Sequence, residues 1–403
     1  ASERVPLETG DSFRIFDFEL KVLEPAQLVV LAVDRADLRP RGEFPLVPGG
    51  ALLAYGDGHR VAIEQVANLA RIDATRLADK LALIFYYDES EPTFAVLSNP
   101  ERLQVYLDRG FVQMAEMVNW SRLSNGVKSA ALMRRAHHDA NTVANNRVVF
   151  GRRIVDMPLA RRQLMKIMLA TEQAVSMSFM TADALDRAEA GSQDAAALLR
   201  VLTPVLKYRA TRDARKVCGE AMEMRGGIGY IEEFATPRLL RDAHLGSIWE
   251  GTGNIMAIDT LKRAVGRHGA EAALGADLHA RIDDMPGVPQ GWRDRLHGFT
   301  DRAIGFAREV AGRSENEAEA RRATSTLYHV ASAVTFAWES SRIHAMRGDA
   351  RRLLLSKLVV DHRLTAQDPF AALPSAGDGV IAGRLLGDRA LSMADAAGML
   401  GTA

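Results

Sequence analysis

The sequence predicts a mainly α fold, in which a four-helix bundle with an extra helical tail follows a small β-rich or α+β region. Two observations lead to this prediction. Short apolar runs of strand length, separated by Gly- and Pro-containing turns, recur near the beginning of the 403-residue chain. From Gly110 onward, apolar residues recur with the spacing of amphipathic helices. We therefore expect three parts: the β-rich region at 1–108, the bundle at 109–268 and the helical extension at 280–403.

Three runs in the first part have the composition of β-strands, namely residues 13–18, 28–33 and 81–87. A turn signal, Pro-Gly-Gly at 48–50, lies between the second and the third run. Residues 60–80 differ, because their apolar residues fall roughly on one helical face. A small mainly-β or α+β unit is the expected result.

The first two helices of the bundle have recognisable ends. Apolar residues at helical spacing predict the first long helix over 111–146. Pro158 is expected to begin the second helix, because a proline in the first turn costs no hydrogen bond. The polar break at 190–192 is expected to end it.

The third and fourth helices complete the predicted bundle. Ser192 is suited to cap the third helix, which should end at Gly226. Pro204 lies inside it and is expected to kink or divide it. A fourth helix is expected over 254–266, and antiparallel packing then buries all four apolar stripes. Helices of the extension are predicted at 292–313, 317–346, 351–364 and 392–400.

Composition and charge exclude several classes of protein. Lys plus Arg and Asp plus Glu are both 51, whereas a dedicated nucleic-acid binder usually carries a basic excess. The single cysteine, Cys218, rules out a disulfide within the chain, and we expect it to pack quietly. No apolar run approaches the roughly 18 residues that span a bilayer, and residues 1–10 lack the apolar stretch of a signal peptide. We expect a cytoplasmic protein with neither a membrane nor a nucleic acid as partner.

The most informative stretch begins with the sequence RGGIGY at 225–230. Its glycines permit positive φ values or a close approach of backbone to a ligand, although a helix C-cap followed by a turn explains them equally well. The sequences RLLRDA at 238–243 and IWEGTGNI at 248–255 follow in order. Earlier in the chain, RVVFG occupies 147–151.

This ordered series resembles the signature of the acyl-CoA dehydrogenase superfamily. That signature comprises an R-x-x-F-G element, a GGxGY turn, an RLxRDA helix and an EGT turn, and Arg122 stands where the family has D-x-x-R on its first long helix. The resemblance covers residues 110–265. Within the superfamily, the sequence IWEG at 248–251 and the extra helical tail are most similar to the AidB-like branch. The family places a helical domain and a β-domain before this bundle, so we expect residues 1–108 to be an atypical, short amino-terminal region. It is a diverged and shortened β-domain, or an unrelated domain fused to the bundle, or the missing half of the flavin site comes from a partner chain.

The resemblance implies FAD as the cofactor and Glu250 as the catalytic base. Glu250 would remove the α-proton of an acyl-CoA thioester while the β-hydrogen leaves as hydride to the flavin. Its backbone N–H would help to polarise the thioester carbonyl. The simpler alternative is a carboxylate that is placed near a helix start because the helix dipole favours it there.

The resemblance also assigns binding residues. Cofactor contacts are implied for Arg147, Phe150, Gly226, Gly227, Thr252 and Asn254, and substrate contacts for Arg122, Tyr230 and Gly251. The alternatives are that Thr252 is a simple N-cap and that Arg147 is a solvated arginine at a helix end.

Two positions depart from the family pattern. Glu223 stands where the family often has glutamine, and Asn119 replaces the acid three residues before Arg122. His137 and His138 are adjacent, and adjacent residues diverge on a helix, so no metal site is expected.

The implied partners follow from the family. They are an acyl-CoA substrate of fatty acid metabolism and an electron-transfer flavoprotein or a similar acceptor. In the family the arginine at the position of Arg147 reaches the FAD of a neighbouring subunit, which implies a homodimer or homotetramer. The alternative function is a non-catalytic or regulatory flavoprotein, or a partner subunit of a heteromeric dehydrogenase.

Overall fold

The computed structural model divides into two compact units, Ala1–Glu116 and Met117–Ala403. Before Pro100 it describes only strands. From Pro100 to Gly401 it describes the backbone except at residues 367, 369, 371–376 and 388, and it describes side chains from Met117 on, apart from those gaps and residues 377 and 378.

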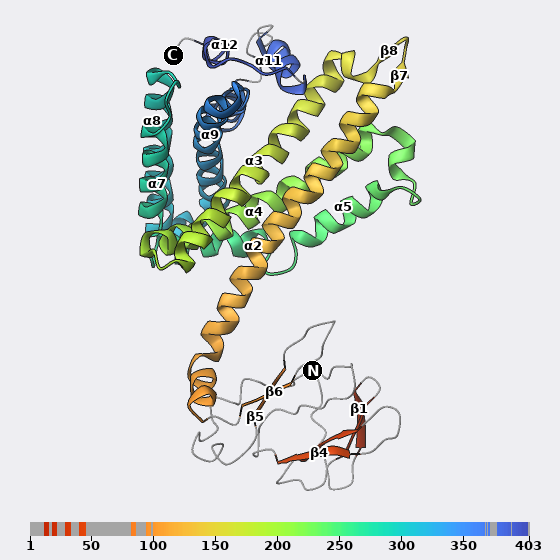
Figure 1. Cartoon of the computed structure of the whole chain (residues 1–403), viewed down its shortest axis with the longest axis vertical. Helices are drawn as coiled ribbons and strands as arrows, with labels where there is room; N and C mark the ends of the chain where they lie inside the picture. Colours follow the sequence, from red (N-terminus) through yellow and green to blue (C-terminus); the bar gives the residue numbers. More distant parts are fainter. Residues whose placement is uncertain are drawn as a thin grey trace. The chain divides into compact units, whose positions relative to one another are not determined.

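The strands of the first unit form three antiparallel pairs (Figure 1). The pairs are β1 (Ser12–Ile15) with β2 (Phe18–Lys21), β3 (Val29–Val33) with β4 (Pro40–Pro45), and β5 (Ala82–Phe85) with β6 (Phe94–Leu97). The predicted strands at 28–33 and 81–87 are confirmed by β3 and β5. The single strand predicted at 13–18 is wrong, because Ile15 pairs with Phe18 and the run forms a hairpin. The helix predicted at 60–80 lies outside the described residues.

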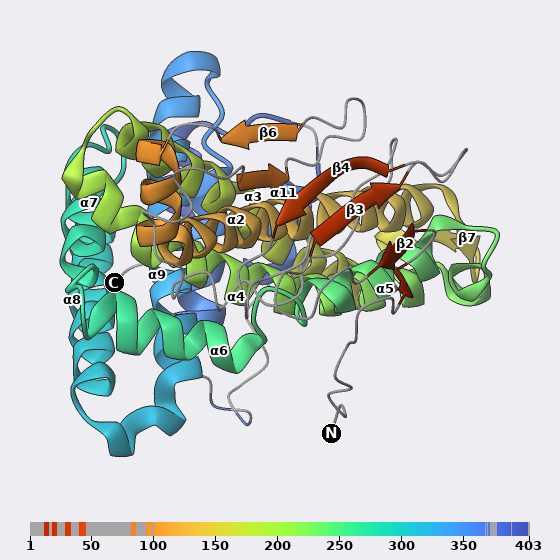
Figure 2. The same cartoon turned by 90° about the horizontal axis from the view of Figure 1, so that it is seen from below.

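The second unit is helical (Figures 1 and 2). Its bundle and site region contain α2 (Pro100–Asn146), which runs into it from the first unit, β7 (Val148–Val149), β8 (Arg152–Arg153), η2 (Ile154–Asp156), α3 (Pro158–Glu189), α4 (Gln193–Met224), η3 (Gly226–Tyr230), α5 (Ala235–Gly246), α6 (Gly253–Ile258) and the π-helix η4 (Asp259–Val265). Its later part contains α7 (Glu271–Asp283), α8 (Gln290–Gly312), η5 (Ser314–Glu319), α9 (Ala320–Arg347), α10 (Arg352–Val359), the π-helix η6 (Val360–Leu364), α11 (Gly377–Leu386) and α12 (Met393–Gly398).

Two predicted helix starts are confirmed, and of the two effects predicted for Pro204, a kink or a division, the division does not occur. Pro158 begins α3, and the Ser192 side chain accepts a hydrogen bond of 3.3 Å from the Ala195 N–H at the start of α4. Pro204 does not divide its helix, since α4 is continuous around it. A proline inside a helix costs about 3 kcal/mol, and the packing of the buried Pro204 offsets that cost.

The core of the second unit begins with the close packing of α3 on α4. Helix α2 joins them through small and apolar residues that recur every three or four positions: Leu123, Ala130, Met133, Ala136, Ala140 and Ala144. A Cβ atom built on Gly126 would lie 2.7 Å from Leu206 Cγ, so the glycine allows α2 to approach α4 closely.

The predicted extension packs against the bundle within the same compact unit. Helix α9 contacts both α3 and α4, and one hydrophobic cluster runs through the bundle and the later helices. Buried polar contacts reinforce this junction, because Gln173 of α3 donates to Ser332 Oγ of α9 at 2.7 Å. Helices α7 and α8 lie side by side at one edge of the unit (Figures 1 and 2).

Two helices lie where the sequence did not predict any, α7 and α11. Glycines lower the helix propensity of α11, which contains Gly377, Gly379 and Gly383, so tertiary packing forms it. In the residues that the structure describes, no helix combines the length and the apolar character needed to cross a bilayer.

Candidate functional site

Glu250 lies on the turn between α5 and α6. After α5 ends, the N–H groups of Ile248 and Trp249 both donate to the Leu245 carbonyl, at 2.9 and 3.3 Å. Glu250 then has φ 55° and Gly251 has φ 99°. A left-handed backbone is costly for a residue with a Cβ, so the surrounding structure must hold Glu250 in this conformation.

Two cationic side chains bind three successive carbonyl groups of this turn. Lys207 Nζ of α4 donates to the Trp249 carbonyl at 2.8 Å and also to the Gly251 carbonyl. Arg122 Nε of α2 donates to the Glu250 carbonyl at 3.2 Å. We refer to Lys207 and Arg122 together as the cationic clamp. The clamp fixes the backbone on both sides of Glu250, whose side chain stays partly exposed.

Arg122 is anchored by a carboxylate that the family motif did not point to. Its Nη1 pairs with Asp259 Oδ2 at 2.9 Å and donates to Asn119 Oδ1 at 3.3 Å. Asp259 opens the π-helix η4, so it supplies from another segment the negative charge that Asn119 lacks. The Arg122 side chain is 12% exposed, so it contacts the Glu250 carbonyl from the buried side of the turn.

Lys207 is a residue of the candidate site that the sequence analysis did not single out. Only 1% of its surface is exposed. Burial, together with the charge of Arg122, lowers its pKa to about 8, while the Glu250 carboxylate acts in the opposite direction. The available signal was a lysine directly after the largely apolar segment 201–206. A charge that follows such a segment on a buried helix requires buried partners.

A second group of predicted residues gathers where α2 ends. Arg147 Nη1 donates to the Arg225 carbonyl at 3.1 Å, and Gly226 has φ 67° beside it. A Cβ atom on Gly226 would lie 3.3 Å from Arg147 Nη1. The glycine thus exposes its backbone next to a guanidinium group.

The aromatic residues of this second group are exposed. Phe150 has φ 51° and, with Gly151 at φ 78°, forms the two-residue turn of the β7–β8 hairpin, where its side chain is 97% exposed. Tyr230, at the end of η3, is 77% exposed. Arg225 lies beneath this surface, paired with Asp139 at 3.8 Å.

The predicted site residues therefore form two groups. The base-side group contains Arg122, Glu250, Gly251, Thr252 and Asn254, and the arginine-side group contains Arg147, Phe150, Gly226, Gly227 and Tyr230. Between Arg122 and Asn146, α2 extends about 36 Å (Figure 1). Within one chain, the structure does not bring Arg147 to Glu250.

The two remaining members of the base-side group lie at the start of α6. Thr252 occupies the N-cap position, but its side chain makes no capping hydrogen bond. The Asn254 side chain accepts from Arg321 Nε of α9 at 2.7 Å. The sequence did not single out Arg321, which brings the later helices to the base-side group.

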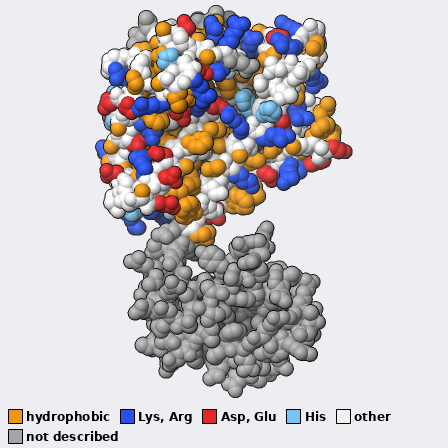
Figure 3. All heavy atoms as spheres, in the orientation of Figure 1, with side chains coloured by type: hydrophobic (Ala, Val, Ile, Leu, Met, Phe, Trp, Pro, Cys, Tyr) orange, Lys and Arg blue, Asp and Glu red, His pale blue; other side chains and the backbone are white. Residues whose placement is uncertain are grey.

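Hydrophobic side chains gather on the molecular face that α2 crosses (Figure 3). Trp120 of α2 and Leu245, Ile248 and Trp249 beside the turn are exposed. Lys128 Nζ lies 5.1 Å from the centre of the Trp249 ring. This apolar surface, with the ammonium group of Lys128 next to it, suits a ligand that has both a hydrocarbon and an anionic part.

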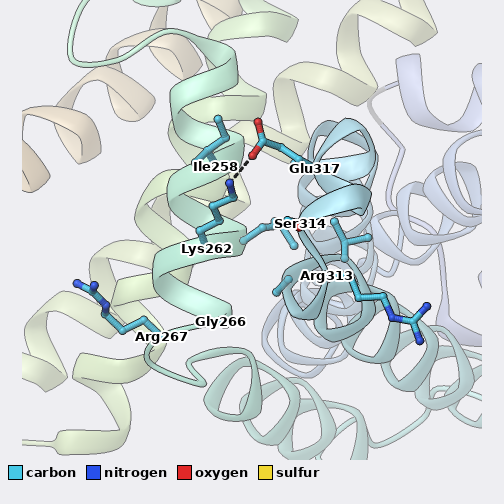
Figure 4. A pocket seen from close by; sticks show the side chains of 11 residues that line it. Ile258, Lys262, Gly266, Arg267, Arg313, Ser314 and Glu317 are labelled. Atoms are coloured by element: carbon cyan, nitrogen blue, oxygen red, sulfur yellow. Dashed lines mark hydrogen bonds and ion pairs between the residues drawn. The ribbon is translucent and has the colours of Figure 1, made fainter.

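A separate cavity of about 440 Å³ lies beside η4 (Figure 4). Its lining includes Ile258 and Val310, and the ion pair of Lys262 with Glu317 lies across it. None of the predicted site residues lines this cavity, so it is not the candidate site.

The donors in both groups fit the anionic part of a dinucleotide such as FAD. The open backbone of Gly226 beside Arg147 offers donors of the kind that bind phosphate oxygens. The Thr252 hydroxyl is not used by its own helix. Among the described residues, no three His, Cys, Asp or Glu side chains are arranged to hold a metal ion.

Comparison with known proteins identifies this part of the chain. Residues 108–265 match the family described as acyl-CoA dehydrogenase, C-terminal domain. Residues 108–265 therefore form a domain of the acyl-CoA dehydrogenase superfamily. The chain is 34% identical over 216 residues to acyl-CoA dehydrogenase family member 11 of Caenorhabditis elegans, a match that covers 53% of this chain and 34% of that protein.

Other proteins named for this superfamily also resemble the chain. The putative acyl-CoA dehydrogenase AidB of Escherichia coli is 37% identical over 153 residues, covering 38% of this chain and 28% of that protein. The chain thus spans about a third of the length of these curated relatives. The crystal structure of Caenorhabditis elegans ACDH-11 in complex with C11-CoA superimposes with a TM-score of 0.57 at 26% identity, covering 64% of this chain and 45% of that one.

Proposed function

We propose that the chain is an FAD-dependent acyl-CoA dehydrogenase-like oxidoreductase that uses Glu250 as its base. The observation that carries this proposal is the position of Glu250. It is the residue of an acyl-CoA dehydrogenase domain that two cations hold in a left-handed conformation on an exposed turn. A strained residue that the surrounding structure fixes so firmly is typical of an active site.

The chemistry divides between the carboxylate and the backbone of Glu250. A carboxylate oxygen would take the α-proton of an acyl-CoA thioester. In the described part of the chain, the Glu250 N–H has no backbone acceptor, so it is free to donate to the thioester carbonyl and stabilise negative charge there. FAD, when bound, supplies the acceptor for the β-hydrogen, which leaves with its electron pair.

The remaining binding roles are proposals of the same kind. Arg147, Phe150, Gly226, Gly227 and Thr252 would hold FAD. Tyr230 and Gly251 would lie at the acyl-CoA, whereas the contacts of Arg122 support a role in holding the turn. Asn254 would act beside FAD together with Arg321, its hydrogen-bond partner.

The separation of the two groups supports an assembly of subunits. Because about 36 Å of α2 lies between Arg122 and Asn146, a site that uses both groups needs a second chain. A homodimer, or a homotetramer built from such dimers, would join the arginine-side group of one chain to the base-side group of another. A cytoplasmic place in fatty acid metabolism, with an electron-transfer flavoprotein as acceptor, completes the proposal.

The decisive experiment measures turnover after reconstitution with FAD. Saturated acyl-CoA thioesters of several chain lengths are offered with an artificial electron acceptor, and the enoyl-CoA product is identified by mass spectrometry. Glu250→Gln should fold normally and lose at least about a thousandfold in turnover, since it keeps the shape but cannot accept a proton. Glu189→Gln, at the exposed end of α3, is the matched control. Wild-type turnover in Glu250→Gln would refute the proposed base.

A partner subunit of a heteromeric dehydrogenase is the second candidate. The exposed side chains of Phe150 and Tyr230 in the arginine-side group are compatible with it, because a different chain can cover them. Affinity purification from the native cells separates the two cases. A stoichiometric larger dehydrogenase would support the second candidate, and an active homo-oligomer would exclude it.

A further inference from the structure

Three successive carbonyl groups, those of residues 249, 250 and 251, point at buried or half-buried cations. Lys207 binds the first and the third, and Arg122 binds the second. Lys207 is only 1% exposed, and its ammonium group donates to two carbonyl groups of one turn. It is therefore not a solvated surface charge. The turn that Lys207 binds contains two consecutive residues with positive φ, Glu250 and Gly251.

The geometry of the peptide unit gives these contacts a direction. In a trans peptide unit the C=O and the following N–H point in opposite directions, and the described chain has no cis peptide. Binding of the Trp249 carbonyl by Lys207 therefore turns the Glu250 N–H away from Lys207. In the same way, the contact of Lys207 with the Gly251 carbonyl turns the Thr252 N–H outward.

We propose that Lys207 is the positioning residue of this active site: it holds the Trp249–Gly251 turn so that the Glu250 N–H and carboxylate face the substrate. This inference rests on the proposed function of Glu250. Lys207 itself lies behind the turn and touches neither substrate nor cofactor. The opposing influence of the Glu250 charge on the pKa of Lys207 is consistent with their proximity.

Lys207 differs from Arg122 in what it controls. Arg122 is tied to Asp259 and Asn119 and binds only the Glu250 carbonyl. Lys207 bridges two carbonyls that flank Glu250, so it sets the distance between the two ends of the turn. Removing its ammonium group leaves both carbonyls without that donor and lets the left-handed residue relax.

The test compares Lys207→Met, which keeps the length and apolar stem of the side chain, with Lys207→Gln, which retains an N–H donor. The matched control is Lys128→Met, which removes a cation beside the Trp249 ring and leaves the clamp intact. Hydrogen–deuterium exchange is followed in the peptide that covers residues 245–253, on the full chain without added FAD. We expect exchange there to accelerate at least tenfold in Lys207→Met, by a smaller factor in Lys207→Gln, and less than twofold in Lys128→Met.

Turnover then distinguishes positioning from general stability. In the FAD-loaded protein, Lys207→Met should lower kcat at least tenfold with KM changed less than threefold, because the base is misplaced while the acyl-CoA surface is intact. Unchanged exchange in the 245–253 peptide of a folded Lys207 variant would overturn the inference, as would an unchanged kcat. If the wild-type protein has no turnover, the proposed function fails, and the exchange measurement still decides whether Lys207 holds the turn.

Discussion

Gly229 is the single residue with the least room for a side chain in the arginine-side turn. A Cβ atom there would lie 2.2 Å from the Met222 carbonyl oxygen and 3.1 Å from Arg225 Cβ. We expect Gly229→Ala to lower the free energy of unfolding by about 2 kcal/mol or more, because backbone must move to accommodate the methyl group. Urea denaturation measures the change.

Gly227 is the matched control for this prediction. A Cβ atom on Gly227 would meet no heavy atom within 4 Å. Gly227→Ala should therefore change the free energy of unfolding by less than about 1 kcal/mol. Equal losses in the two variants would contradict the packing described for η3.

The titration of Lys207 predicts a pH dependence of stability. Burial, with the charge of Arg122, lowers its pKa in the folded protein to about 8, against an ordinary value of 10.5, while Glu250 acts in the opposite direction. Between these two values the unfolded chain holds a proton that the folded chain has lost, so this group makes the free energy of unfolding rise with pH. Below pH 8 both states are protonated, and the contribution is constant.

Lys207→Met isolates that contribution. The difference in free energy of unfolding, wild type minus variant, should be flat below about pH 7 and should rise by up to about 1.4 kcal/mol per pH unit between about pH 8 and pH 10. Urea midpoints at a series of pH values measure it. A difference that stays flat over this range would show that Lys207 keeps an ordinary pKa in the folded protein, and one that falls would show a raised pKa.

Single residues also show why the sequence predicted only part of the candidate site. The position of Glu250 on a Gly-flanked turn followed from the ordered motifs. The motifs did not predict the roles of three other residues, Lys207, Asp259 and Arg321. Each of them contacts a partner that is far away in the sequence. A residue pattern along the chain does not contain such pairings; packing of α4, η4 and α9 around the turn creates them.

Among the helices, a polar cluster joins α3, α9 and α10. Arg352 pairs with Glu339 at 2.6 Å and with Glu172 at 2.9 Å, and it donates to Ser176 Oγ at 2.6 Å. All four side chains are largely covered by the neighbouring helices. Arg352→Ala would leave Glu339 without its cation and Glu172 with Arg134 alone, and we expect a loss of about 2 kcal/mol in the free energy of unfolding.

An exposed ion pair on α9 provides the control for the cluster. Arg322 pairs with Glu319 at 2.6 Å, with both side chains substantially exposed. Solvent screens such a pair, so Arg322→Ala should change the free energy of unfolding by less than about 0.5 kcal/mol. A comparable loss in both variants would mean that the cluster does not fasten α9 and α10 to α3.

Helices with strong caps and long apolar stripes were the elements that the sequence predicted well. Pro158 and Ser192 act locally, and their effects on α3 and α4 do not depend on tertiary packing. Pro204 and the glycines of α11 show the opposite case, because burial against other helices overrides a weak local preference. The hairpin of β1 and β2 was missed because an apolar run does not reveal a turn inside it.

At the scale of the whole molecule, the two groups of site residues predict complementation between subunits. Glu250→Gln and Arg147→Ala should each be inactive as a homo-oligomer. If one site takes Glu250 from one chain and Arg147 from another, a mixed dimer contains one intact site. Co-expression in equal amounts should then restore about a quarter of wild-type turnover, because half of randomly formed dimers are mixed. No recovery in dimers proven to be mixed would place both residues in one chain's site.

Removal of an α-proton by Glu250 is the central claim, and proton exchange measures it without requiring complete turnover. The FAD-loaded protein is incubated with a saturated acyl-CoA in deuterium oxide without an electron acceptor, and loss of the α-proton signal is followed by nuclear magnetic resonance. We expect the wild-type protein to exchange the α-protons and Glu250→Gln to leave them in place. Exchange at the wild-type rate in Glu250→Gln would show that another group is the base.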